Sequence, residues 1–473
     1  MFDVSRRGFI GCMAAAAGTR VFAKSGTANL KLGVLSDVHI FSEVNVPVLE
    51  KAFIFFRDAG ADGVIIAGDM ADTGLVDQLE LIGAAWFRVF PNGKAPDGRK
   101  VENLFVYGNH DVSNYREDYL AKICPNEAER PSHRINRDPK GTWEKCFKEP
   151  WLGGVYAKQI KGYTFIGSHW GHEKELDAFL QANADKLGLR NGKPFFYAQH
   201  PHPGDTVQGP WAWGHDHGVS TRALEKFPNA VAFSGHSHYS HTDDRCVWQG
   251  AFTSIGTSSL SYIFAQYYRE NGETHGNRVQ QMPCLNEGAG KQGLLMHVYD
   301  DCLVLERREF VTGEKTGPDW VVPLDGSKAF AFETRAAKMV APEFALGAAI
   351  SISQGKGKDR KGQETEQVTV SFPPAVASKT SRVYDYEVRA VAYLEDADYE
   401  VAVRRVLSRR ASICRRRRRR RTFRPASSRS RTSLARARSA SSCVRPNATA
   451  TRAAKSAPGS GNRRRRREKK LRA

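Results

Sequence analysis

Five short segments in the first half of the chain carry the residue types that bind metal ions. Each contains Asp, Asn or His, and each follows a short apolar run. The segments are Asp37-Val38-His39, Gly68-Asp69, Gly108-Asn109-His110-Asp111, Gln199-His200 and Gly235-His236-Ser237-His238. Carboxylate, imidazole and amide donors without a thiolate suit Mn, Fe or Zn in a reactive site rather than a structural zinc. The pattern therefore predicts metal-dependent chemistry.

The number and spacing of the donors indicate more than one ion. Seven donors exceed what one ion needs, and two ions about 3.5–4 Å apart, which clamp a phosphate and activate a water, would use them all. Side chains two residues apart on a strand point the same way, so we expect Asp37 with His39, and His236 with His238, to reach one centre. Glycines at three of the motifs allow tight turns where a side chain would crowd the site.

Alternating strands and helices must position these segments. Apolar runs predict strands at Leu32–Leu35, Gly63–Ala67, Asn103–Tyr107, Phe195–Ala198 and Ala230–Phe233, and apolar faces predict helices at Val46–Ala59, Leu75–Phe90 and His172–Leu187. A hairpin is predicted over Val155–Trp170, and residues 113–153 read as an irregular insertion. Ligands of open α/β sheets lie outside the carboxyl ends of strands, where these motifs fall. The expectation is a layered α/β domain over residues 28–307.

With these five motifs in this order over residues 30–240, the sequence resembles the calcineurin-like metallophosphoesterase family. The resemblance implies an αββα sandwich and two divalent or trivalent metal ions, with Mn, Fe or Zn as candidates. The implied ligands are Asp37, His39 and His238 for the first ion, Asn109, His200 and His236 for the second, and Asp69 as the bridge between them. Purple acid phosphatases have a tyrosine ligand where this chain has Asp72, so that branch is not favoured.

The same resemblance implies roles for two residues that do not bind metal. His110 would protonate or stabilise the leaving oxygen, and Asp111 would orient His110. The implied activity is hydrolysis of a phosphoric monoester or diester, with a metal-bridging hydroxide as nucleophile. Two alternatives are a non-catalytic metal-binding protein, which intact His110 and Asp111 disfavour, and a nucleic-acid-interacting protein.

Other polar residues near the motifs receive structural interpretations. Asp72 is expected to cap a helix or support the turn. His215 and His217 imitate the last motif but do not follow an apolar strand, so we interpret them as loop residues. His202 and His169 are expected to be hydrogen-bonded loop histidines. The Trp-rich loop Gly204–Gly218 is either a lid over the site or a segment packed on the surface.

The chain after residue 307 differs in pattern. Period-two alternation at Gln367–Phe372 and Tyr384–Val391, between frequent prolines, predicts a small immunoglobulin- or fibronectin III-like β-sandwich over residues 308–403, with a hairpin loop at Gly355–Gly362. Residues 404–473 are rich in Arg and Ser and are predicted to be disordered. We interpret this tail as an out-of-frame extension, in which case the sandwich is truncated.

Charge is distributed unevenly. Residues 404–473 carry 27 Lys and Arg side chains against one acid, whereas residues 1–403 carry 44 basic and 50 acidic side chains, a net charge of −6. The folded part therefore gives no reason to expect nucleic acid as a partner, and a phosphoester is the expected substrate.

The first 23 residues resemble a twin-arginine export signal, with Arg6-Arg7 before a weakly apolar stretch and a cleavage site expected at Val21-Phe22-Ala23. The twin-arginine translocation machinery is the implied partner, and the implied location is periplasmic or secreted. No stretch is long and apolar enough to predict a membrane span. Export would permit a disulfide such as Cys124–Cys146, but buried free thiols are favoured.

Overall fold

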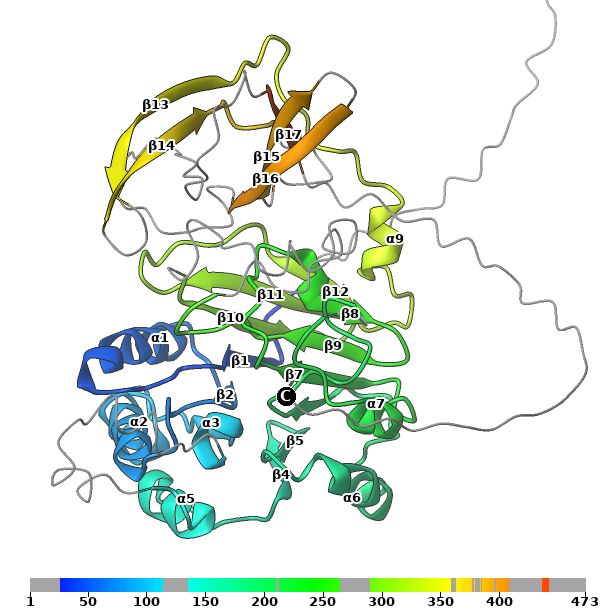
Figure 1. Ribbon diagram of the computed structural model, residues 1–473. Helices are drawn as coiled ribbons and strands as arrows, with labels where there is room; N and C mark the ends of the chain where they lie inside the picture. Colours follow the sequence, from blue (N-terminus) through cyan, green and yellow to red (C-terminus); the bar gives the residue numbers. More distant parts are fainter. Residues whose placement is uncertain are drawn as a thin grey trace, which may run out of the picture.

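The computed structural model describes residues 26–113, 135–209, 212–263, 290–358, 363–376, 378, 383, 385–394, 397–407 and 436–441. Within these residues the chain forms two six-stranded sheets with flanking helices and two smaller antiparallel sheets (Figure 1). No helix in the described part of the chain has the length and apolar character that a membrane crossing requires.

The first large sheet is built around three parallel strands. Its order is β12-β11-β10-β1-β2-β3, in which β1, β2 and β3 run parallel and the remaining neighbours are antiparallel. The strands are β1 (Leu30–Leu35), β2 (Gly63–Ala67), β3 (Glu102–Val106), β10 (Gln292–Val298), β11 (Cys302–Glu309) and β12 (Trp320–Pro323). Because the parallel strands end at one edge, the segments that follow them emerge side by side.

The second large sheet has the order β4-β5-β6-β7-β9-β8. Strands β5, β6, β7 and β9 are parallel, and the two edge strands pair antiparallel with their neighbours. The strands are β4 (Val155–Ile160), β5 (Tyr163–Ser168), β6 (Phe195–Ala198), β7 (Ala230–Ser234), β8 (Val247–Gln249) and β9 (Thr253–Gly256). Both sheets are therefore mixed.

Alternation along the strands explains how the sheets and helices form layers. In β3, Leu104 and Val106 lie in the apolar cluster between the two sheets, whereas Phe105 packs among helices on the opposite face. The helices against the first sheet are α1 (Val46–Asp58), α2 (Val76–Val89) and α5 (Pro139–Phe147), and those against the second are α6 (Leu176–Asn183) and α7 (Val219–Leu224). Fully burying a side chain such as Phe105 contributes about 1.5–3 kcal/mol.

The remaining elements after β12 are short. Helix α9 (Phe332–Ala336) is followed by an antiparallel pair, β13 (Ser351–Lys358) and β14 (Glu364–Ser371). A second small sheet has the order β16-β15-β17, with β15 (Asp385–Leu394), β16 (Ala397–Leu407) and β17 (Arg436–Ser441). A small apolar cluster around Val370 and Val388 joins the two sheets. The immunoglobulin- or fibronectin-like assignment stays a prediction.

The five strands and the first two helices expected in the α/β domain agree with the structure to within two residues, and the predicted hairpin is β4–β5. The insertion over residues 113–153 is not wholly irregular, because it contains α5; residues 114–134 lie outside the described part. The helix predicted from His172 begins as an α-helix only at Leu176. The predicted loop at Gly355–Gly362 is in part strand, because β13 continues to Lys358.

The predictions for the two chain ends lie mostly beyond what the structure describes. The export signal falls within residues 1–25, which are outside the described residues. Of the predicted tail, the structure describes 404–407 at the end of β16 and 436–441 as β17. Cys124 is also outside, and Cys146, Cys246 and Cys302 are buried and form no disulfide within the described part of the chain.

Candidate metal centre

The structure brings six of the seven predicted ligands into one connected cluster, contributed by the segments that follow β1, β2, β6 and β7. Three overlapping groups have ligand atoms within 4.8 Å of one another: Asp37, His39 and His238; His39, Asp69 and His110; and Asp69, His200 and His236. The groups share His39 and Asp69, so the cluster is one continuous site. Asn109 follows β3 at the same edge.

The first group is closely spaced. His238 Nε2 lies 2.9 Å from Asp37 Oδ1, and the Nε2 atoms of His39 and His238 lie 3.3 Å apart. His39 Nε2 lies 3.9 Å from the same carboxylate oxygen. Two imidazole nitrogens and one carboxylate oxygen that converge in this way match the donor set of a divalent metal ion.

The second group meets the first at Asp69. His200 Nε2 lies 2.9 Å from Asp69 Oδ2 and 3.1 Å from His236 Nδ1. The same Asp69 oxygen lies 3.8 Å from His39 Nε2 in the first group. Asp69 therefore lies between the two groups, where a carboxylate can serve both.

Asn109 provides an independent indication that the site is built for a cation. Its Oδ1 atom is buried and has no hydrogen-bond partner. A buried carbonyl-type oxygen without a partner costs about 1–3 kcal/mol, and native structures rarely leave one unpaired without cause. A metal ion is the partner that such an oxygen fits.

Most of the ligands occupy an uncommon backbone conformation. The φ angles of Asp37, His39, Asp69, His236 and His238 are 49°, 47°, 52°, 66° and 54°. Non-glycine residues in the left-handed region carry strain, and such residues cluster at functional sites. Strand alternation was therefore the wrong reason for expecting these pairs to converge: β1 and β7 end before the ligands, and left-handed turns direct the side chains.

Two glycines are required by close approach to ligands. Gly68 has a φ of +86°, and a Cβ there would lie 2.4 Å from His200 Nδ1. A Cβ on Gly235 would lie 2.3 Å from Asp37 Oδ2. Each glycine in one motif thus makes room for a ligand from another motif.

Hydrogen bonds on the far side of three imidazoles fix their orientation. His200 Nδ1–H donates to the Ala67 carbonyl at 2.8 Å, and His238 Nδ1–H donates to the Tyr262 carbonyl at 2.9 Å. His39 Nδ1–H donates to Asp72 Oδ1 at 3.1 Å. Each bond leaves the Nε2 lone pair directed into the cluster, as metal-ligating histidines require. Asp72 thus supports a ligand, which the sequence did not reveal.

The structure differs from expectation at Asp111. Its buried carboxylate accepts from the backbone N–H groups of Gly108 and Ala71, both at 2.7 Å, and of Met70 at 3.3 Å. His110 is oriented instead by the Asp72 carbonyl oxygen, 2.5 Å from its Nδ1. Asp111 therefore holds the two turns together, because its two oxygens are directed at backbone rather than at the imidazole.

Charges in the cluster stabilise one another. Burial alone would raise the pKa of Asp69, but His200, His39 and His110 hold it well below its usual range. Burial acts to lower the pKa of His200, but Asp69 and Asp37 outweigh it and raise that pKa to about 9. The carboxylates therefore favour a positive charge at this point, which a bound cation would supply in place of the proton.

The neighbouring histidines have structural partners, in line with their interpretation from sequence. His202 is buried between two hydroxyls, with Nδ1 at 2.5 Å from Ser234 Oγ and Nε2 at 2.6 Å from Ser237 Oγ. His169 Nδ1 accepts from the Tyr107 N–H at 3.0 Å. His215 Nε2–H donates to the Val207 carbonyl at 3.0 Å.

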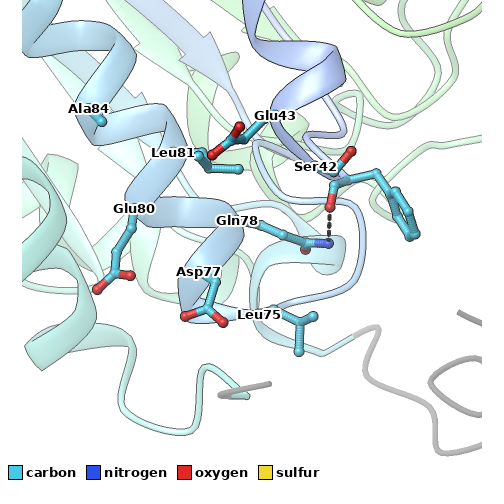
Figure 2. Close-up of a pocket in the computed structure, with 9 residues that line it drawn as sticks. Ser42, Glu43, Leu75, Asp77, Gln78, Glu80, Leu81 and Ala84 are labelled. Carbon is cyan, nitrogen blue, oxygen red and sulfur yellow. Dashed lines mark hydrogen bonds between the residues drawn. The ribbon is translucent and has the colours of Figure 1, made fainter. Parts of the chain in front are cut away.

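A cavity of about 600 Å³ lies beside the first turns of α2 and contains none of the seven ligands (Figure 2). Three carboxylates contribute to its wall, from Glu43, Asp77 and Glu80, so it does not suit a phosphate anion. Its other lining residues are Phe41, Ser42, Leu75, Gln78, Leu81 and Ala84. The metal cluster, rather than this cavity, is the candidate functional site.

Comparison with protein families agrees with the geometry. The calcineurin-like phosphoesterase family model matches residues 30–240. A search of curated proteins found no match. Similar solved structures include a dimetal phosphatase from Danio rerio, with 12% identity, 63% of this chain and 100% of that chain covered, and a TM-score of 0.36.

Two further structures are the GAP50 anchor of the Plasmodium inner membrane complex (10% identity, 62% and 88% covered, TM-score 0.37) and an archaeal phosphodiesterase (12% identity, 62% and 100% covered, TM-score 0.24). These identities and TM-scores are low, so the assignment rests on the family model and on the residues of the cluster. Residues 30–240 of this chain form a phosphoesterase domain of the calcineurin-like metallophosphoesterase family.

Proposed function

We propose that this domain hydrolyses phosphoric monoesters or diesters with two metal ions held by the seven predicted ligands. The observation that carries the proposal is the position of Asp69. Its Oδ2 lies 2.9 Å from His200 Nε2 and 3.8 Å from His39 Nε2, and it thus joins two groups of donors. A site for a single ion does not require a carboxylate that lies between two sets of imidazoles.

Asp37, His39 and His238 would hold one ion, and Asn109, His200 and His236 the other, with Asp69 shared. When bound, the two ions would supply positive charge for the phosphoryl oxygens and acidify the attacking water. Hydrogen bonds at Nδ1 of His39, His200 and His238 keep these three imidazoles in the tautomer that presents Nε2. The buried carboxylates keep the local charge negative until cations enter.

His110 is the residue that we assign to the leaving group. Its Nδ1 lies 2.5 Å from the Asp72 carbonyl oxygen and so carries a hydrogen. Its Nε2 faces the cluster, 3.9 Å from Asp69 Oδ2, and the side chain is 25% exposed. In the imidazolium form Nε2–H is available to a departing alkoxide. General acid catalysis of this kind contributes about 10²–10⁴-fold in rate.

Turnover and metal content measured together test the proposal. The full chain, loaded separately with Mn²⁺, Zn²⁺ or Fe²⁺, is assayed on a 4-nitrophenyl monoester and diester. We expect His110→Asn to keep its metal and to lose about 10²–10⁴-fold in rate, and Asp69→Asn to lose metal and rate together. His172→Asn is the control, because its side chain is 41% exposed and pairs with the exposed residue Glu175.

Two outcomes would contradict the proposal. A fully loaded protein without turnover on either ester would favour the non-catalytic metal-binding alternative. Unchanged turnover in His110→Asn would remove that residue from the leaving-group step.

A further inference from the structure

Aromatic side chains flank the imidazole ligands on both sides of the cluster. Trp213 stacks on His236, with ring centroids 4.4 Å apart and an interplanar angle of 24°. Trp170 lies 5.7 Å from the same imidazole, and Tyr262 lies 4.2 Å from His238 on the other side. Trp213 is the most exposed of these rings, with 40% of its surface accessible to solvent.

The segment after Trp213 is held by an unusually complete set of hydrogen bonds. The Asp216 carboxylate accepts from the backbone N–H groups of Gly204 at 2.9 Å, Gly218 at 2.8 Å and Ser220 at 2.9 Å. The carbonyl of Gly214, which directly follows Trp213, accepts from the His202 N–H at 2.7 Å. Asp216 therefore ties the beginning and the end of this loop together.

His215 anchors the same segment from its other edge. Its Nε2 donates to the Val207 carbonyl at 3.0 Å, and its Nδ1 accepts from the Asp205 N–H at 3.1 Å. The Gly214–His217 motif, which resembles a metal motif in sequence, thus serves to position the loop. A large aromatic side chain that is held in place on a metal ligand, yet substantially exposed, is presented to solvent at the edge of the site.

We propose that Trp213 is a specificity residue that stacks with a planar aromatic ring of the phosphoester substrate. This inference rests on the proposed function. The substrate class is therefore phosphoesters of alcohols that carry an aryl or heteroaryl ring. Offset or edge contacts between aromatic rings add to the affinity beyond burial of apolar area, by an amount that corresponds to roughly 2- to 12-fold in binding.

A matched pair of substrates tests the inference. Benzyl phosphate and cyclohexylmethyl phosphate, together with their methyl diesters, have leaving alkoxides of the same class and differ in whether the ring is aromatic. We expect Trp213→Leu to lower the ratio of kcat/KM for the benzyl ester to that for the cyclohexylmethyl ester by about 3- to 10-fold. Trp213→Phe should retain most of the preference. Tyr399→Leu, at a residue 55% exposed on β16, is the control and should leave the ratio unchanged.

Failure of the inference and failure of the proposed function give different results. If the loaded protein turns over both esters and the ratio is the same in Trp213→Leu, the inference is overturned while the function stands. Loss of bound metal in Trp213→Leu would also overturn it, because the indole would then only support His236.

If no ester is hydrolysed, the proposed function fails. Calorimetry with benzylphosphonate and cyclohexylmethylphosphonate then decides on Trp213, since a preference for the aromatic ligand that Trp213→Leu removes supports stacking, and equal affinities refute it.

Discussion

Asp72 provides a sharp test of how the site is organised, because its side chain and its backbone support different residues. The carboxylate accepts from His39 Nδ1 at 3.1 Å, and the carbonyl oxygen lies 2.5 Å from His110 Nδ1. The Asp72 side chain is 21% exposed and the His39 side chain 2% exposed, so the hydrogen bond is largely shielded from water. Substitution of the Asp72 side chain should therefore weaken the binding of one metal ion and leave the orientation of His110 unchanged.

The magnitude follows from the loss of a carboxylate behind a metal-ligating histidine, which typically lowers metal affinity 10–100-fold. Asp72→Asn keeps an acceptor oxygen and loses the charge, so we expect metal affinity to fall about 10-fold, or about 1.4 kcal/mol. Asp72→Ala loses both and should approach 100-fold, or about 2.7 kcal/mol. The turnover rate at saturating metal should change little, because the carbonyl that orients His110 remains.

The assay is a titration of metal-stripped protein with Zn²⁺ or Mn²⁺ in competition with a chelator, so that two binding steps are resolved. The step that depends on Asp37, His39 and His238 should weaken, whereas the step that depends on Asn109, His200 and His236 should not. Asp58→Asn is the control, since that side chain is 61% exposed. Wild-type affinity for both ions in both Asp72 variants, or equal weakening of both steps, would refute the reasoning.

Three further predictions concern the backbone, the pH dependence of stability and the leader. Gly235→Ala places a Cβ 2.3 Å from Asp37 Oδ2, so metal content should fall, whereas Gly355→Ala, with nothing within 4 Å, should bind normally; equal metal contents would contradict the close-approach argument. Burial lowers the pKa of His169 and of His241 to about 3, so below the unfolded value near 6.5 the unfolded chain takes up protons that the folded chain does not. The free energy of unfolding should therefore decrease from pH 7 to pH 5 by up to about 2 kcal/mol per histidine, measured by urea denaturation, and His169→Gln should lessen the dependence; an unchanged slope would show that His169 is not responsible. We propose that residues 1–23 direct twin-arginine export, so a fusion to a reporter should be exported and lose export in Arg6→Lys/Arg7→Lys; export of the double variant would contradict this.

The convergence of the ligands was predictable because of where the motifs lie. Asp37, Asp69 and Asn109 follow three strands that turned out to be parallel neighbours, and His200 and His236 follow two parallel neighbours in the second sheet. Segments after parallel strands meet at one edge, so residue type and order along the chain were sufficient. The backbone conformation of the ligands was not predictable, because no residue type at these positions indicates a left-handed backbone.

The sequence did not predict the contacts that ligands make with backbone carbonyls or with side chains far away in the chain. His39 pairs with Asp72 across 33 residues, and His238 donates to the carbonyl of Tyr262. The role of Asp111 was misassigned because proximity in sequence to His110 suggested a contact that the turn geometry prevents. Helix α5 did have a signal, since Asp138 caps it and accepts from the Gly141 N–H at 3.0 Å, with Pro139 in the first turn.

The most direct test of the central claim is the electron paramagnetic resonance spectrum of the metal-stripped protein titrated with Mn²⁺. If Asp69 is shared between two sites, two ions should bind per chain and give the spectrum of a spin-coupled pair, and Asp69→Asn should abolish the coupling. Binding of a single ion per chain, or of two ions without coupling, would contradict the two-metal centre.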